Sequence, residues 1–355
     1  MKIKIKASEL LKRLKEIAPI CGGRTTQAAL TCVKMEVGND GVKLSATNLD
    51  HYMTCAFKDG EVLTAGTVLV ACKMFTQVLS SFGEVTIEAE GTTLHFTEGK
   101  NKAKLQTLPL KEVVEDPKIG PSEVILSGNG SAMADDLGWL IKASSSDASR
   151  HILQGAMIFP AQSLAFSSDG KRCHSLAIEA KGNNPVNIHA ESLRFILPVM
   201  RGCESVTVTS DGHWIIFTAG EWCLVSKAIE GMMPIAAVTR VMPDFDRKIT
   251  GSKLEILEAL KACGPMVAAS FRESVTLSSE PMGIVIAATH ENQSIERYVS
   301  GGGIDFAVEL SLSFLSDALA GSGEAVTFEV NDDASPIVMK SEKRKAVLMP
   351  MRGGA

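Results

Sequence analysis

The sequence lacks the patterns that mark common catalytic and metal-binding sites. Its eight cysteines are scattered, with neither a CxxC pair nor the clustered spacing of a zinc site. GxGxxG and GxxxxGK[ST] phosphate loops are absent, and no GxSxG segment surrounds a serine nucleophile. We therefore expect no catalytic residue, no metal and no cofactor, and we interpret the cysteines as reduced, mostly buried thiols.

Long hydrophobic runs are also missing. No stretch approaches the roughly 18 consecutive apolar residues of a membrane span. The first residues, MKIKIKASELL, alternate like an edge strand and lack the apolar core of a signal peptide. These absences predict a cytoplasmic protein without a membrane partner.

The balance of charge is slightly acidic. The net charge of −5, from 36 basic and 41 acidic residues, argues against a protein that simply coats nucleic acid. The three successive thirds of the chain carry about +2, −3 and −4. Such a gradient suits head-to-tail association between copies, but random surface variation gives a swing of the same size.

Three polar turns recur at one spacing. They begin at Thr47 (TNLDHYMT), Ser168 (SDGKRCHSLAI) and Thr289 (THENQSIERYVS), and successive starts are 121 residues apart. A repeat of this length is a whole domain, because solenoid repeats run about 20–50 residues. The sequence therefore predicts an α+β protein of three repeated domains, residues 1–121, 122–245 and 246–355, each with two helices packed on antiparallel sheet.

Helical periodicity supports this division. First helices are expected near 7–20, 129–144 and 251–264, and second helices near 71–83, 189–202 and 310–323. The third of the first helices shows an apolar stripe of Leu254, Leu257 and Leu260, joined by Ile256, and Ser or Asn near each start suggests an N-cap. Each second helix ends near a glycine suited to a left-handed C-cap: Gly83, Gly202 and Gly321. Residues 118–123 and 243–252 are the expected linkers.

Several motifs resemble one family along nearly the whole chain. They are ELLKRLKEIAPICGGRTT, LSATNLD, LHFTEGKNKAKLQTLPLKE, SRHILQG, SSDGKRC, SKAIEGMMP and the closing VLMPMRGGA. Their order, spacing and threefold repetition resemble the bacterial DNA polymerase III beta subunit, the replicative sliding clamp. The resemblance implies a DNA-clamp fold, a head-to-tail ring dimer and a non-catalytic processivity factor that associates with the nucleoid.

The resemblance also implies contacts with double-stranded DNA that carry no sequence specificity. A sliding ring should touch phosphates through exchangeable cations, without reading bases. The candidate DNA-binding residues are Lys12, Arg13, Lys15, Arg24, Lys73, Arg150, Arg194, Arg201, Lys253 and Lys261. For most of them a solvated surface charge is an equally good interpretation. For Arg24, in the GGR segment, the functional interpretation is favoured.

A pocket for short Gln/Leu/Phe-containing peptides of the polymerase, the clamp loader and repair factors is the second implied site. By motif match it comprises Leu153, Ser168, Gly170, Lys171, Arg172, Cys173, Pro234, Val241, Ser311, Phe314, Val347, Met349 and Met351. Met residues suit an adaptable surface, and Arg172 is expected to bond peptide carbonyls. The family's His-Arg-Leu is replaced by Lys171-Arg172-Cys173, which predicts altered peptide selectivity.

The implied dimer interface comprises Lys73, Lys100, Lys102, Met266, Glu291 and Glu296. The acidic stretch expected in the last third is reduced to Glu291 and Glu296, with Arg297 between them and the next strand. Ring closure is therefore expected to be weaker, or to depend more on apolar contacts near Met266. The alternative interpretation is an adaptor of the same fold that binds peptides without being loaded at replication forks.

Overall fold

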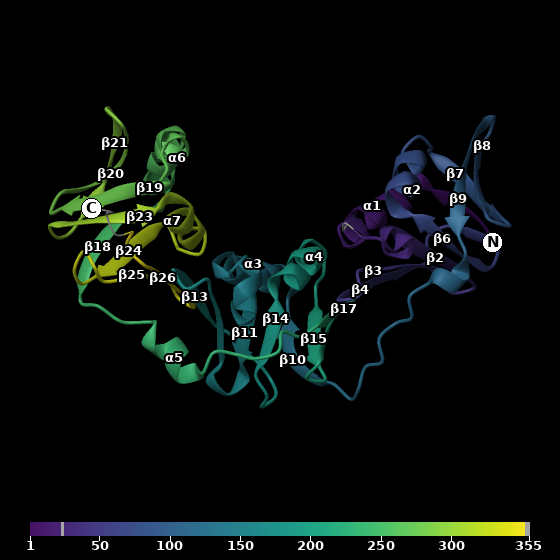
Figure 1. The fold of residues 1–355 in the computed structure, drawn as a ribbon, viewed down its shortest axis with the longest axis horizontal. Coiled ribbons are helices and arrows are strands. Elements are labelled where there is room, and N and C mark those ends of the chain that lie inside the picture. Colours follow the sequence, from purple (N-terminus) through teal and green to yellow (C-terminus); the bar gives the residue numbers. More distant parts are fainter. Residues whose placement is uncertain (23–24, 352–355) are drawn as a thin grey trace. The chain divides into compact units, whose positions relative to one another are not determined.

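The computed structural model describes residues 1–22 and 25–351. The chain divides into two compact units, and each contains two stretches of sequence (Figure 1). Unit 1 is Met1–Ala134 with Glu191–Ala228, and unit 2 is Asp135–Ala190 with Ile229–Ala355. The divisions fall inside or next to two helices, α3 (Gly130–Leu140) and α4 (Ala190–Met200).

Unit 1 is built on one 13-stranded antiparallel sheet. In spatial order its strands are β10 (Glu123–Gly128), β15 (Val206–Ser210), β16 (Trp214–Ala219), β17 (Trp222–Lys227), β4 (His51–Phe57), β3 (Gly41–Thr47), β2 (Cys32–Gly38), β6 (Gly66–Ala71), β9 (Asn101–Leu108), β8 (Thr93–Glu98), β7 (Glu84–Glu90), β1 (Lys2–Lys6) and β5 (Glu61–Thr64). Helices α1 (Ala7–Ile17) and α2 (Cys72–Leu79) contact each other and pack on this sheet.

Unit 2 contains two antiparallel sheets. The nine-stranded sheet has the order β14 (Val186–His189), β11 (Gly155–Phe159), β12 (Leu164–Ser168), β13 (Arg172–Ala177), β26 (Arg344–Leu348), β25 (Ile337–Lys340), β24 (Ala325–Val330), β18 (Arg247–Ser252) and β22 (Gly301–Gly302). The four-stranded sheet has the order β21 (Gln293–Val299), β20 (Gly283–His290), β19 (Ser274–Glu280) and β23 (Phe306–Ser311). Helices α6 (Lys253–Ala269) and α7 (Leu312–Leu319) pack together against these strands.

Alternation in the strands and periodicity in the helices place the apolar side chains in the core. In β3, Val42, Leu44 and Ala46 are buried while the residues between them are half-buried, which is the period of a strand with one covered face. In α1, Leu10 and Leu14 are completely buried, so this helix binds the sheet through one stripe.

The predicted repeat is visible in the strand pairing. The three polar turns join the hairpins β3–β4, β12–β13 and β20–β21. The pairs Thr47↔Tyr52, Ser168↔Cys173 and Thr289↔Ser294 flank these turns, each 121 residues after the last. Pairing of β4 with β17 and of β13 with β26 carries each large sheet across an expected domain boundary. The three-domain division therefore stays a prediction from the repeat.

Two details of the predicted helices are wrong. Leu254 is 67% exposed, because the buried stripe of α6 runs through Ile256 and Leu260, as predicted, and continues to Cys263. Side-chain N-caps exist at Asn129, which accepts from the Ala132 amide at 3.0 Å, and at Ser252, which accepts from the Glu255 amide at 3.4 Å. Helix α1 begins after Lys6 without a side-chain cap.

The glycines after the second helices do not adopt the predicted left-handed conformation. Gly83, Gly202 and Gly321 have negative φ, and ordinary turn hydrogen bonds end the helices, as from the Gly202 amide to the Val199 carbonyl at 3.1 Å. Gly321 is needed for another reason. A Cβ there would lie 2.3 Å from the indole nitrogen of Trp139, so glycine permits a close approach.

The second expected linker is partly regular structure. Residues 118–122 contain no helix or strand, as predicted, but β18 occupies most of 243–252. The segment before it forms a short helix, α5 (Ile235–Arg240).

Candidate binding surfaces

Most predicted DNA-facing cations lie on helices with their side chains in solvent. Exposed members of this group are Lys12, Lys15, Lys73, Arg150, Arg194, Arg201 and Lys261. Lys253 is half-buried, and its Nζ donates to the Ser322 carbonyl at 2.8 Å. Arg24 lies outside the described residues. The described helices thus present several cations that can exchange between phosphates.

Arg13 corrects this prediction, because it is 6% exposed. Its Nε and Nη2 donate to the two carboxylate oxygens of Glu221 at 2.9 and 3.0 Å, and Nη2 also reaches Asp59 at 2.8 Å. The guanidinium lies 3.9 Å over the Phe57 ring and bonds Glu9 at 3.0 Å. Burial by itself lowers the pKa of Arg13, but its hydrogen bonds to Glu221 and its attraction to the other acids raise the pKa above its ordinary value. Arg13 is a structural ion-pair residue and is not a solvent-facing phosphate ligand.

Five predicted pocket residues line one surface cavity of about 460 Å³ in unit 2. They are Lys171, Ser311, Phe314, Met349 and Met351. Backbone hydrogen bonds hold the last segment in place. The Met349 amide donates to the Lys171 carbonyl at 3.0 Å, and the Met351 amide donates to the Glu309 carbonyl at 2.8 Å. The cavity has the size and mixed lining of a site for a few side chains of a peptide.

Four further residues complete the wall of this cavity and were not predicted: Arg272, Glu273, Ser313 and Pro350. Arg272 and Glu273 lie in the turn between α6 and β19, where Glu273 has a φ of +50°, in the left-handed region.

 

Nothing in the sequence around Arg272 and Glu273 marked them as pocket residues, since only the folded chain brings this turn beside the C-terminal strand.

Arg172 was expected to bond peptide carbonyls, but its side chain makes hydrogen bonds within the chain. Its Nε bonds Asp169 at 3.1 Å, its Nη1 bonds Asp317 at 2.8 Å, and its Nη2 donates to the Lys142 carbonyl. The guanidinium also lies 4.1 Å over the ring of Phe314. Each of the three nitrogens thus has a partner within the chain, and peptide-carbonyl bonding by Arg172 stays a prediction. Arg172 fixes the ring that lines the cavity.

Ser168 and Gly170 shape the turn that presents Lys171. The Ser168 hydroxyl donates to the Arg172 carbonyl at 2.7 Å and accepts from the Gly170 amide at 3.0 Å. Gly170 has a φ of +85°, and a Cβ there would lie 2.8 Å from Nη1 of Arg150. A glycine is therefore required at this position.

Other predicted pocket residues belong to a hydrophobic cluster in unit 2. Cys173 and Val347 are buried in it, and Leu153 packs against it. Burial raises the pKa of Cys173 to about 12, so this thiol is an apolar wall and not a nucleophile. Helix α5 contributes Val238, which is completely buried in the same cluster and was not predicted.

Pro234 and Val241 flank α5 at its two ends. Pro234 precedes the helix as its N-cap residue and is exposed. Val241 is 41% exposed, and its carbonyl accepts a weak hydrogen bond from Sγ of Cys173 at 3.8 Å. The two residues thus lie beside the cluster.

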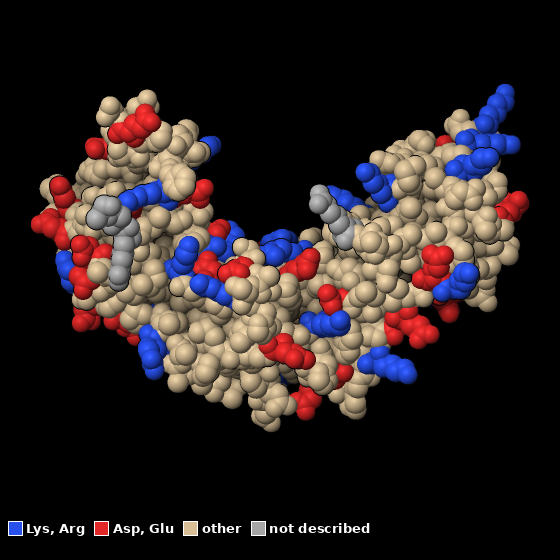
Figure 2. Space-filling model, in the orientation of Figure 1, with Lys and Arg blue, Asp and Glu red and all other residues tan. Residues whose placement is uncertain are grey.

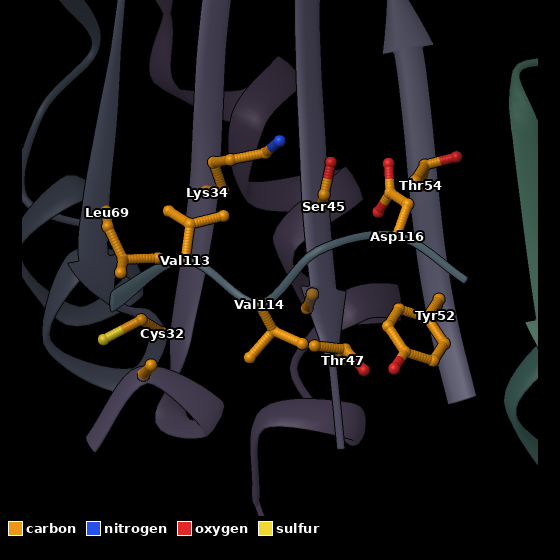
Figure 3. Close-up of a pocket in the computed structure, with 12 residues that line it drawn as sticks. Cys32, Lys34, Ser45, Thr47, Tyr52, Thr54, Leu69, Val113, Val114 and Asp116 are labelled. Atoms are coloured by element: carbon orange, nitrogen blue, oxygen red, sulfur yellow. The ribbon is translucent and has the colours of Figure 1, made fainter. Parts of the chain in front are cut away.

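A smaller cavity lies in unit 1, where the segment after β9 crosses the sheet (Figure 3). Val113 and Val114 pass over Lys34, Ser45 and the neighbouring strands. The cavity has a volume of about 30 Å³, which is room for one water. The Ser45 hydroxyl is buried without a protein partner, so a water is the occupant that this space fits.

The predicted interface residues lie at strand edges and helix surfaces. Lys100 and Lys102 are exposed at the end of the β8–β9 hairpin, where Figure 2 shows basic side chains. Glu291 and Glu296 are exposed on the β20–β21 hairpin, whose tip is acidic in the same view. Met266 is half-buried on α6, and Lys73 is exposed on α2.

Both hairpins leave strand edges open among the described strands. Strand β9 pairs with β8 along its length, but with β6 only at Leu69↔Leu108 and Val70↔Thr107. Strand β21 is the last strand of the four-stranded sheet and pairs with β20. An open edge offers unpaired amides and carbonyls to another strand.

Comparison with known proteins supports the fold. A sequence model described as the N-terminal domain of the DNA polymerase III beta subunit matches residues 1–115. The beta sliding clamp of Salmonella typhimurium is 23% identical over 99% of this chain and 100% of its own, and that of Escherichia coli is 22% identical over the same shares.

Solved structures of sliding clamps have the same fold. The Streptococcus pyogenes beta subunit has a TM-score of 0.90 at 17% identity, and covers 99% of this chain and 100% of its own. A clamp from Bartonella birtlesii bound to griselimycin has a TM-score of 0.89 at 20% identity, with the same coverage.

The chain thus has the fold of the sliding clamps. Its first 115 residues match the model of the DNA polymerase III beta subunit, and nearly its whole length is similar in sequence to beta sliding clamps. None of the described helices is both long and apolar enough to cross a membrane.

Proposed function

We propose that this protein is a DNA sliding clamp. Two copies close head to tail around double-stranded DNA and tether a polymerase and other factors without any catalytic step. A tethered polymerase re-engages its template at high effective concentration, which is the physical basis of processivity. The proposal places the protein in the cytoplasm, on the nucleoid.

The observation that carries the proposal is a pairing between strands of two successive repeats, which occurs twice. We call each such pairing a strand joint. Strands β4 and β17 pair with Met53 opposite Leu224, and strands β13 and β26 pair with His174 opposite Ala346. Each joint has the same extra hydrogen bond. The Ala56 amide donates to the Glu221 carbonyl at 2.9 Å, and the Ala177 amide donates to the Lys343 carbonyl at 2.8 Å.

The repeat predicts the third joint, which requires a second copy. The strands equivalent to β4 and β17 in this joint are β21 and β9, whose edges are open. The same register sets Ala103 opposite Ile295 of the second copy, and Lys102 opposite its Glu296. The Tyr298 amide would donate to the Lys100 carbonyl, and Tyr298, now 69% exposed, would be covered.

The exposed cations and the cavity support the other two functions of the proposed clamp, which are DNA contact and peptide binding. Exposed Lys and Arg side chains on the helices suit sequence-independent phosphate contacts. The cavity beside Phe314 and Met349 suits short Gln/Leu/Phe-type peptides of the polymerase, the clamp loader and repair factors.

Light scattering across a concentration series, followed by a DNA retention assay, tests the proposal. We expect about twice 37.8 kDa and retention on nicked circular DNA that ends when the circle is cut. A monomer at every concentration contradicts the ring. A dimer that is not retained on circles, but binds peptide, favours the adaptor of the same fold.

A further inference from the structure

The first helices of the three repeats carry equivalent buried stripes. The stripe residues are Leu10, Leu14 and Ile17 in α1, Met133, Leu137 and Leu140 in α3, and Ile256, Leu260 and Cys263 in α6. One more buried position lies on the same face of each helix. It holds Arg13 in α1, Asp136 in α3 and Ala259 in α6.

In the first joint this position forms an ion pair with a hairpin turn. Arg13 bonds Glu221, the residue before β17, through two of its nitrogens at 2.9 and 3.0 Å. The Glu221 carbonyl is the one that accepts from the Ala56 amide. The charge pair therefore lies directly beside the strand joint.

In the second joint the same pair occurs with the charges exchanged. Asp136 bonds Lys343, the residue before β26, and is also bonded by Nη2 of Arg344 at 2.7 Å. The Lys343 carbonyl accepts from the Ala177 amide. Asp136 is 8% exposed and Arg13 is 6% exposed, so the helix member of each pair is buried.

In the third joint only half of the pair exists. The residue before β9 is Lys100, at the turn position of Glu221 and Lys343. The helix position is Ala259, whose methyl group cannot bond an ammonium group. We infer that the joint between two copies lacks the ion pair that closes both internal joints, and that Lys100 is left without its counterpart from α6 of the second copy.

This inference rests on the proposed ring. Its consequence is that the copy–copy joint depends on strand pairing, the exposed Lys102 and Glu296 and apolar contacts, and is the weakest of the three joints around the ring. A carboxylate at position 259 would rebuild the geometry of Asp136 with Lys343.

Sedimentation equilibrium of the full-length chain tests the inference with Ala259→Asp. We expect the dimer Kd to fall about tenfold or more, because a two-copy ring contains the joint twice. The gain should vanish in Ala259→Asp combined with Lys100→Ala. An unchanged Kd in a natively folded Ala259→Asp variant overturns the inference, whereas a wild-type monomer overturns the ring itself.

Lys100→Ala alone keeps the test decisive if the buried aspartate prevents folding. Lys100 is exposed, so its removal should leave folding intact. We expect its dimer Kd to stay within about twofold of wild type, since the missing counterpart leaves little to lose. A tenfold weaker dimer would show that Lys100 already has a partner, and would overturn the inference.

Discussion

Arg13 and Lys12 are neighbours on α1 but face different surroundings. Lys12 is exposed, whereas Arg13 is surrounded by three carboxylates and the Phe57 ring. Both were predicted to contact DNA. A buried guanidinium is common where several acids compensate its charge, and such acids come from distant parts of the chain.

The two residues give a matched pair of variants. We expect Arg13→Leu to lower the free energy of unfolding by about 3 kcal/mol, because it leaves three carboxylates without their cation. Lys12→Ala should change it by less than about 0.5 kcal/mol, yet weaken binding to linear DNA at low salt. Urea unfolding and DNA titration measure these effects, and equal losses of stability would contradict the assignment.

His174 gives a prediction about pH. Its ring stacks on Trp139 at a centroid distance of 4.2 Å, its Nδ1 bonds the Trp139 carbonyl, and its Nε2 is buried without a partner. Burial lowers the pKa of His174 to about 4, and the nearby Arg172 adds to this effect.

Between about pH 6.5 and pH 4, His174 binds a proton in the unfolded chain but stays neutral in the folded chain. Stability should therefore rise with pH across this window and be fully present above it. His174→Gln should flatten the rise in urea midpoints, while exposed His151→Gln should not. An unchanged slope in His174→Gln would contradict the prediction.

At the scale of elements, the end of β26 forms the wall of the cavity. Met349 is 45% exposed there, and its amide is fixed to the Lys171 carbonyl. Met282, which is 86% exposed in the β19–β20 turn, is a matched methionine outside the cavity lining.

Met349→Lys should lower the affinity for a fluorescent Gln/Leu/Phe-type peptide about tenfold, because it places a charge in the apolar part of the site. Met282→Lys should leave the affinity unchanged. Fluorescence anisotropy with the full-length chain measures both, and equal effects of the two substitutions would remove the cavity from the peptide site.

At the scale of the whole molecule, retention on DNA should have two different salt dependences. Phosphate contacts weaken as salt rises, whereas a closed ring on a circle cannot dissociate without opening. We therefore expect high salt to release the protein from linear DNA and to leave it on nicked circles. Parallel loss from both forms would contradict topological binding.

The sequence by itself determined the repeat, most helices and the hairpin turns. These features depend on local spacing: the apolar period of a helix, the alternation of a strand and the polar turns at Thr47, Ser168 and Thr289. The motif resemblance also identified five residues that line the cavity, including Phe314 and Met349.

Only the tertiary structure decided which charges are buried and which donors are free. Arg13 was predicted to contact DNA and Arg172 to bond peptide carbonyls. In the structure they donate hydrogen bonds to Glu221 and Asp317, which are distant in the sequence. Arg272 lines the cavity and Val238 lies in the neighbouring hydrophobic cluster because of contacts between distant parts of the chain, which no local pattern predicts. Electrostatic pairing depends on distances across the fold, whereas the repeat depends on neighbours along the chain.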